Sequence, residues 1–250
     1  MSAATPVALV TGGSRGIGAG ISDALARAGF AVAVNYRTDH LSARAVVERI
    51  RTAGGTAEKF QADVTQKAEI RDLHRRVNTD LGPIEALVLN ATGPQPDGSL
   101  RDLSPTQFQE QFSHFILGPL ELIQACVESM KQRHSGRIVF VGSEVVDLVP
   151  AHTAAYTAAK SAQEAAARCW ARELARDGIT VNVVRPGFIP GDRHKETPDS
   201  AIARYSEQVP LGRLGTASDI GNAVAFFCSD SASFITGSRL SVNGGNTLGS

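Results

Sequence analysis

Short, nearly continuous apolar runs recur along the 250-residue chain and alternate with longer amphipathic stretches. Such runs lack the polar alternation of a half-exposed strand and suit strands that are covered on both faces, as in a parallel sheet. The predicted strands cover residues 7–10, 31–35, 57–62, 86–89, 137–141, 179–184 and 239–242. The intervening helices are predicted to include residues 19–29, 42–53, 67–81, 105–131, 153–177 and 217–228.

This strictly alternating order predicts an α/β fold of one kind. We expect a doubly wound, parallel seven-stranded sheet with helices on both faces, which is a Rossmann fold and a three-layer α/β/α sandwich. A chain of 250 residues can bury a full core as a single domain, and no linker or repeat divides it, so one domain over residues 1–250 is expected. Ligands of such folds bind at the carboxyl ends of the strands.

Composition excludes several classes of function. Lys plus Arg equals Asp plus Glu at 25 each, so neither nucleic acid nor an anionic membrane is an expected partner. Uninterrupted apolar runs are too short to cross a membrane, and the N-terminus lacks a signal-peptide pattern, so a cytoplasmic protein is expected. The three cysteines, Cys126, Cys169 and Cys228, have no metal-ligand spacing and are predicted to be buried thiols in a reducing compartment, with no metal.

A glycine-rich turn follows the first predicted strand and leads directly into a helical pattern. Glycines let the backbone approach a pyrophosphate, and the N-terminus of the next helix offers free amides and a positive dipole. A lone glycine turn is weak evidence, but its place between strand and helix makes it a predicted dinucleotide site. The candidate cofactor-binding residues of this turn are Gly12, Ser14, Arg15, Gly16, Ile17 and Gly18.

The end of the second strand predicts which dinucleotide binds. An acidic residue there would bind the 2'-hydroxyl of NAD, but the segment reads Asn35, Tyr36, Arg37. Arg37, together with Arg15, can supply charge-assisted hydrogen bonds to a 2'-phosphate. The alternative is that both arginines are merely exposed. NADPH is the expected cofactor, and Tyr36 and Arg37 join its candidate binding residues.

Tyr156 and Lys160 lie four residues apart in a predicted helix and therefore share one face, with Ser143 upstream at the end of a strand. Alone, such a pair is more often a solvated face. A hydride that reaches a carbonyl carbon leaves an alkoxide that must be protonated, and Tyr156 is the candidate acid. The Lys160 cation favours the phenolate and is expected to lower the pKa of Tyr156, and Ser143 would polarise the carbonyl.

Several ordered motifs make the chain resemble the short-chain dehydrogenase/reductase family, most closely bacterial 3-oxoacyl-[acyl-carrier-protein] reductases. They are the glycine turn, Asp63-Val64, Ser143, the Tyr156 and Lys160 pair, the segments 185–189 and 210–215, and the closing segments 235–237 and 242–245. The resemblance implies reduction of a small-molecule or carrier-bound carbonyl, most simply a 3-oxoacyl thioester, by a homotetramer. A tailoring ketoreductase acting on a polyketide-like or other small carbonyl is the alternative.

The resemblance also implies roles for single residues. Asp63 would hold the adenine amino group with the Val64 amide beside it, and Lys160 would bind the nicotinamide ribose. The remaining candidates would line the nucleotide cleft or meet the nicotinamide carboxamide: Asn90, Ala91, Pro186, Gly187 and Ile189.

Three places depart from the family pattern. The family's asparagine, which is thought to hold a water of the proton relay, is replaced by Phe115, and His114 could substitute only if the helix shifts or bulges. His114 is therefore predicted to pack or to support the site indirectly. In an ungapped alignment Leu89 and Thr92 stand where the family's Asn-Asn-Ala-Gly segment begins and ends, and a register shifted by one residue is the alternative. Pro190-Gly191 follows Ile189 where the family often has threonine. The polar segment 192–199 is expected to be a substrate-covering loop or simply a solvated one.

Three other functions fit the sequence less well. Family reductases of enoyl double bonds have six residues between tyrosine and lysine rather than three, which disfavours that reaction. A nucleotide-binding protein with little turnover would account for Phe115, but Ser143, Tyr156 and Lys160 are all retained. A hydrolase is disfavoured because Ser143 is not in a G-x-S-x-G elbow.

Overall fold

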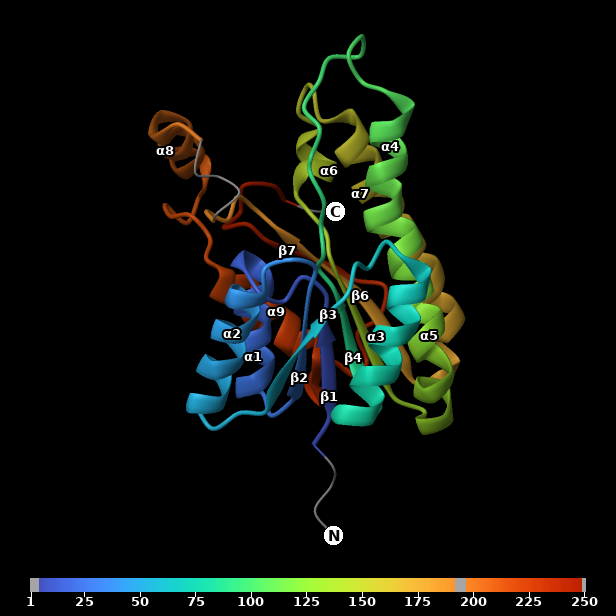
Figure 1. The fold of residues 1–250 in the computed structure, drawn as a ribbon. Coiled ribbons are helices and arrows are strands. Elements are labelled where there is room, and N and C mark those ends of the chain that lie inside the picture. The colour runs from blue at the N-terminus through green and yellow to red at the C-terminus, as the bar shows by residue number, and fades with distance from the viewer. Residues whose placement is uncertain (1–4, 192–196, 249–250) are drawn as a thin grey trace.

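A computed structural model describes residues 5–191 and 197–248 of the chain. Its centre is a seven-stranded sheet with the order β3-β2-β1-β4-β5-β6-β7, in which every neighbouring pair is parallel (Figure 1). The chain reverses its direction of winding between β1 and β4, which is where doubly wound folds open a crevice. The predicted fold class is confirmed.

All seven predicted strands are present, and their ends agree with the prediction within two residues. Successive residues of β1 face opposite layers, since Val7 and Leu9 belong to one apolar cluster and Ala8 and Val10 to the other. This burial on both faces explains the continuous apolar runs. The strands are β1 (Val7–Val10), β2 (Ala31–Tyr36), β3 (Ala57–Gln61), β4 (Ile84–Leu89), β5 (Gly136–Val141), β6 (Ile179–Pro186) and β7 (Arg239–Val242).

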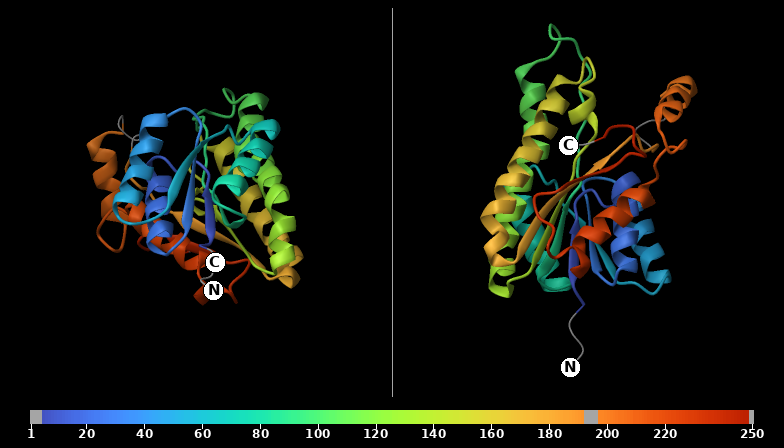
Figure 2. Two further views of the ribbon diagram at one scale, coloured as in Figure 1. Left: turned by 60° about the horizontal axis from the view of Figure 1, so that its bottom comes forward. Right: turned by 180° about the vertical axis from the view of Figure 1, so that it is seen from behind.

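Helices cover both faces of the sheet (Figure 2). One layer consists of α1 (Gly16–Arg27), α2 (His40–Thr52) and α9 (Ala217–Cys228). The other consists of α3 (Lys67–Asp80), α5 (Gly118–Arg133) and α7 (Ala154–Leu174), the last of which ends in the 3₁₀ turn η2 (Ala175–Asp177). Two short elements, α6 (Val145–Leu148) and η4 (Asp230–Ala232), complete the connections.

The predicted helix over residues 105–131 is interrupted. It consists of α4 (Pro105–Phe112), a π-helical turn η1 (Ser113–Leu117) and α5. Two residues account for the break: Pro119 has no N–H to donate to the carbonyl of residue 115, and Gly118 approaches the Val64 carbonyl so closely that a Cβ would lie 2.2 Å from that oxygen. The prediction of one regular helix was wrong at this point.

A further helix, α8 (Asp199–Gln208), was not predicted. It lies beyond the carboxyl ends of the strands, away from both helix layers (Figure 1), and none of its residues is buried. The predicted covering loop at 192–199, with His194 and Lys195, lies mostly outside the described residues. No helix in the described ranges is long and apolar enough to span a membrane.

The cysteine prediction was partly wrong. Cys126 and Cys228 are buried free thiols, and burial raises the pKa of each to about 12. Cys169 is exposed, because it lies on the outward face of α7, whose inner face turns Ala167 and Ala171 toward the sheet.

Candidate active site

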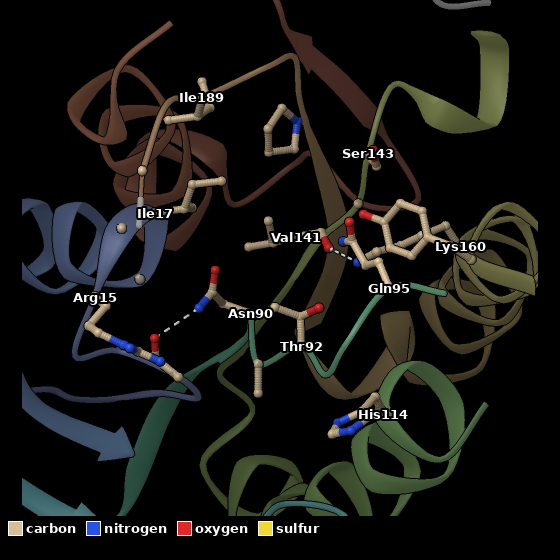
Figure 3. Close-up of a pocket in the computed structure, with 18 of the residues that line it drawn as sticks. Arg15, Ile17, Asn90, Thr92, Gln95, His114, Val141, Ser143, Lys160 and Ile189 are labelled. Atoms are coloured by element: carbon tan, nitrogen blue, oxygen red, sulfur yellow. Dashed lines mark hydrogen bonds between the residues drawn. The ribbon is translucent and has the colours of Figure 1, made fainter. Parts of the chain in front are cut away.

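A cavity of about 680 Å³ opens at the carboxyl ends of the strands. In Figure 3, Arg15 and Ile17 lie on one side of it and Ser143 and Lys160 on the other, with Asn90 between them. Its walls therefore come from segments that are distant in sequence and that the parallel strands bring to one edge of the sheet.

The glycine turn forms one end of the cavity. Gly12 and Gly16 have φ angles of +60° and +49°, a region in which glycine is favoured. At Gly12 a Cβ would lie 3.1 Å from the Ala91 Cα, whereas at Gly16 it would meet nothing within 4 Å, so that the backbone there is open to a ligand. The Arg15 side chain does not cap α1, which leaves the start of this helix suited to an anion.

Asn90 and Thr11 brace that turn. The side-chain nitrogen of Asn90 donates to the backbone carbonyls of Thr11 and Gly12, at 2.9 and 3.1 Å. The Thr11 hydroxyl accepts from the backbone amides of Asn90 and Ala91. Leu89, by contrast, is buried in the core. Asn90 is therefore the polar residue of this segment that reaches the cavity, which settles the register left open between Leu89 and Thr92.

Charged side chains gather at the outer part of this end. Arg15 lies 3.6 Å from the Asp39 carboxylate, and Arg37 lies 3.9 Å from Asp63. Burial acts to raise the pKa of Asp63, but hydrogen bonds from Thr65 and the charge of Arg37 leave it below its usual value. Asp39 was missed because it stands beyond the strand end, as the N-cap of α2, where its side chain accepts from Ser42.

Ser143 follows β5 at the opposite end of the cavity. Its hydroxyl oxygen accepts a hydrogen bond of 3.2 Å from the Val145 amide. The hydroxyl keeps its own proton, so it can donate to an oxygen in the cavity.

Tyr156 and Lys160 lie on α7 and both line the cavity. Lys160 is buried, its Nζ donates to the Val141 carbonyl at 2.7 Å (Figure 3), and the ammonium lies 5.9 Å from the centroid of the Tyr156 ring. The Phe115 ring completes the group: it meets Tyr156 edge to face at 5.6 Å between centroids and lies 4.0 Å from Lys160 Nζ.

Glu144 and Tyr205 form a polar network beside Ser143. Glu144 is buried, and it accepts hydrogen bonds from the Tyr205 hydroxyl and from the side-chain amides of Asn243 and Asn246. The Tyr205 oxygen in turn accepts from the Phe188 amide at 2.8 Å. Burial, followed by the hydrogen bond to Glu144, raises the pKa of Tyr205. The network joins α8, the loop after β6 and the C-terminal segment at one wall of the cavity.

Comparisons with known proteins cover nearly the whole chain. A family model described as enoyl-(acyl carrier protein) reductase matches residues 12–247. The chain is 38% identical over 238 residues to 3-oxoacyl-[acyl-carrier-protein] reductase FabG of Staphylococcus epidermidis, covering 95% of this chain and 97% of the relative. It is 37% identical over 239 residues to FabG of Escherichia coli K12, with 96% of each covered.

The chain belongs to the short-chain dehydrogenase/reductase family. A solved 7α-hydroxysteroid dehydrogenase, complexed with NADH and 7-oxo glycochenodeoxycholic acid, superposes with a TM-score of 0.92 at 29% identity, over 97% of this chain and 94% of that one. The protein is thus an oxidoreductase acting on CH–OH or C=O groups, as the sequence motifs predicted.

The cavity of this reductase brings all of the predicted site residues together. The predicted catalytic residues Ser143, Tyr156 and Lys160 line one end of it, where a carbonyl substrate is predicted to bind, and we call this the carbonyl end. The predicted cofactor residues line the remainder: Gly12, Ser14, Arg15, Gly16, Ile17, Gly18, Tyr36, Arg37, Asp63, Val64, Asn90, Ala91, Pro186, Gly187 and Ile189. Their roles remain predictions.

The π-turn of this reductase determines which of His114 and Phe115 faces Lys160. The helix does bulge at Ser113–Leu117, yet Phe115 and not His114 faces Lys160. His114 lines the cavity wall and packs against Gly93, where a Cβ would lie 2.3 Å from its ring. Burial lowers the pKa of His114, and the Asp63 carboxylate partly opposes this. His114 is thus a packing residue, as predicted, and it also lines the cavity wall.

Besides Asp39, sequence reasoning missed Glu144 and Tyr205, two further polar residues of the cavity wall. Glu144 directly follows Ser143, and this position was the available signal. Tyr205 had none, because α8 was not predicted.

Proposed function

We propose that this protein is an NADPH-dependent reductase that transfers a hydride to the ketone of a 3-oxoacyl thioester. One observation carries the proposal: Ser143, Tyr156 and Lys160 line the same cavity as a glycine turn whose backbone is suited to a pyrophosphate. Full-length relatives named 3-oxoacyl-[acyl-carrier-protein] reductase support the substrate class.

The residues present fit a nicotinamide dinucleotide. The open backbone at Gly16 and the uncapped start of α1 suit its phosphates, Asp63 and Val64 its adenine, and Pro186, Gly187 and Ile189 its carboxamide. When bound, this cofactor supplies the hydride. Arg15 and Arg37 favour the phosphorylated form, because both guanidinium groups line the cavity and can bind a 2'-phosphate. Asp39 opposes that preference only in part, since its carboxylate is already held by Ser42 and Arg15.

The chain's own residues then complete the reaction. The Ser143 hydroxyl donates to the ketone oxygen and stabilises the negative charge that develops there. The Tyr156 hydroxyl gives its proton to that oxygen, so that the C=O bond becomes CH–OH with one hydride and one proton added. Lys160 holds a positive charge nearby, which stabilises the phenolate that remains on Tyr156.

Two other classes of substrate are also candidates. Reduction of an enoyl thioester is suggested by the description of the matching family model, although the three-residue gap between Tyr156 and Lys160 disfavours it. A cyclic or polyketide-like ketone is suggested by the hydroxysteroid dehydrogenase, whose structure superposes closely.

The deciding experiment measures oxidation of NADPH and NADH by the purified protein with a 3-oxoacyl thioester, an enoyl thioester and a cyclic ketone. We expect NADPH oxidation with the 3-oxoacyl thioester, and a loss of at least about a thousandfold in kcat for Tyr156→Phe, because the proton donor is removed. Turnover of the enoyl thioester alone, or wild-type turnover by Tyr156→Phe, would refute the assignment. NADPH binding without any turnover would favour a nucleotide-binding protein.

The same proposal includes a homotetramer in the cytoplasm. Support comes from the family resemblance and from exposed apolar side chains at the C-terminal edge, where Phe234 is fully exposed and Leu240 lies in the edge strand β7. Sedimentation of the purified protein tests the assembly.

A further inference from the structure

Lys160 is held in an unusually closed environment. Only 4% of this residue is exposed, and its ammonium contacts the Val141 carbonyl at 2.7 Å, the Gln163 side-chain oxygen at 3.3 Å and the face of the Phe115 ring at 4.0 Å. A buried ammonium is costly unless fixed dipoles replace its water. Each of these groups presents negative charge density to the ammonium, so each offsets part of that cost.

Gln163 makes a second contact with the other end of its amide. Its nitrogen donates to the Phe115 carbonyl at 3.3 Å, and the whole residue is only 2% exposed. In a regular α-helix that carbonyl would accept from the amide of residue 119, but Pro119 has no N–H. Pro119 therefore removes the α-helical donor of the Phe115 carbonyl, and Gln163, one turn along α7 from Lys160, donates to it instead.

We propose that Gln163 is a positioning residue for Lys160: its carboxamide bridges the Lys160 ammonium and the Phe115 carbonyl. A water molecule between the two would also accept one hydrogen bond and donate one, and the amide reproduces this pattern with protein atoms. Phe115, Pro119 and Gln163 then act together. The Phe115 ring packs against the Lys160 ammonium, Pro119 leaves the Phe115 carbonyl to Gln163, and the Gln163 amide fixes the orientation of the ammonium.

This arrangement fixes the Lys160 ammonium but passes on no proton, because a carboxamide at neutral pH neither gains nor loses one. Gln163 therefore acts through Lys160, on the orientation of the ammonium toward Tyr156 and the cofactor. The inference rests on the proposed function, because it assumes that Lys160 contacts the cofactor and supports Tyr156.

The test replaces Gln163 by methionine, which has a similar length and volume but neither hydrogen bond. We expect the dissociation constant for NADPH to rise about tenfold and kcat to fall about tenfold, with the KM of the ketone changed less than about twofold, because a hydrogen bond to a charged group is lost. Gln163→Glu keeps the acceptor for Lys160 but loses the donor to the Phe115 carbonyl, so we expect NADPH binding to weaken by only about threefold, less than in Gln163→Met.

Gln111→Met is the matched control. Gln111 is also buried, and its nitrogen donates to the Pro94 carbonyl at 2.7 Å, so this variant loses a comparable hydrogen bond that does not involve Lys160. We expect it to lower the melting temperature as Gln163→Met does, with NADPH affinity and kcat unchanged. The proposal is wrong if Gln163→Met behaves like wild type, or if Gln111→Met reproduces its changes in NADPH binding.

NADPH affinity is measured by fluorescence without any ketone. This binding measurement therefore tests the role of Gln163 even if the protein reduces none of the substrates. Absence of turnover by wild type would contradict the proposed function alone. Unchanged NADPH affinity in Gln163→Met would contradict the role of Gln163 alone.

Discussion

The two ends of the cavity are built from different parts of the chain. The nucleotide end consists mainly of backbone: a glycine turn braced by Thr11 and Asn90, with arginines at its rim. The carbonyl end depends on buried polar side chains, among them Lys160, Gln163 and Glu144. Binding a pyrophosphate requires only free amides and space, whereas delivering a proton requires charges that are held in place.

Exposure of the charged groups differs in the same way. The side chains of Arg15 and Arg37 are 55% and 56% exposed, and ion pairs at such positions contribute little to stability. Directly before the cavity residue Pro186, the Arg185 side chain is 1% exposed and is bound by the Glu164 side chain, which is 4% exposed, and by Asp147. The nucleotide end should therefore tolerate changes of charge that would damage the fold at the carbonyl end.

The largest expected effect is on this buried ion cluster. Glu164→Gln leaves the Arg185 charge buried with Asp147 as its remaining close carboxylate, and we expect the free energy of unfolding to fall by about 3 kcal/mol. Urea denaturation monitored by circular dichroism measures it. Asp147→Asn is the control, and we expect a smaller loss because the Asp147 side chain is 29% exposed. Equal, small losses in both variants would show that the carbonyl end does not depend on buried charge.

The features that could be predicted from the sequence are those with local signals. The strands and the glycine turn were predictable because apolar runs and glycine spacing are local signals. Ser143, Tyr156 and Lys160 were found because a helix places residues four apart on one face and the parallel sheet brings strand ends together.

The remaining features depend on contacts between distant residues. Glu164 lies in α7 and Arg185 lies near the end of β6, 21 residues along the chain, and nothing in either segment predicts that their charges are buried together. The π-turn follows from Pro119 and from the approach of Gly118 to Val64, a contact that exists only in the folded protein. Helix α8 packs none of its residues into the core, so its short amphipathic pattern, with Ile202 and Tyr205 three residues apart, was not assigned to either helix layer.

An intermediate effect is expected at the nucleotide end. Arg37→Ala removes a charged donor for the 2'-phosphate, and we expect the KM for NADPH to rise about tenfold while the KM for NADH changes little. Steady-state kinetics with both cofactors measures this. Arg44→Ala is the control, because Arg44 is an exposed arginine of α2 that pairs with Glu48. Equal use of NADPH and NADH by the wild-type protein would contradict the roles of Arg15 and Arg37.

The smallest expected effect is at the wall next to Ser143. Tyr205→Phe removes the hydroxyl that donates to Glu144 and accepts from the Phe188 amide, but Asn243 and Asn246 still bind the carboxylate. We expect the KM of the ketone to rise about threefold with NADPH affinity unchanged, because one of several hydrogen-bonded links between α8 and the cavity wall is lost. Arg204→Ala, an exposed neighbour on α8, is the control. A larger rise in the KM of the ketone, together with weaker NADPH binding, would mean that Tyr205 supports the nucleotide end as well. The two ends would then share the loop after β6 and would not be built independently.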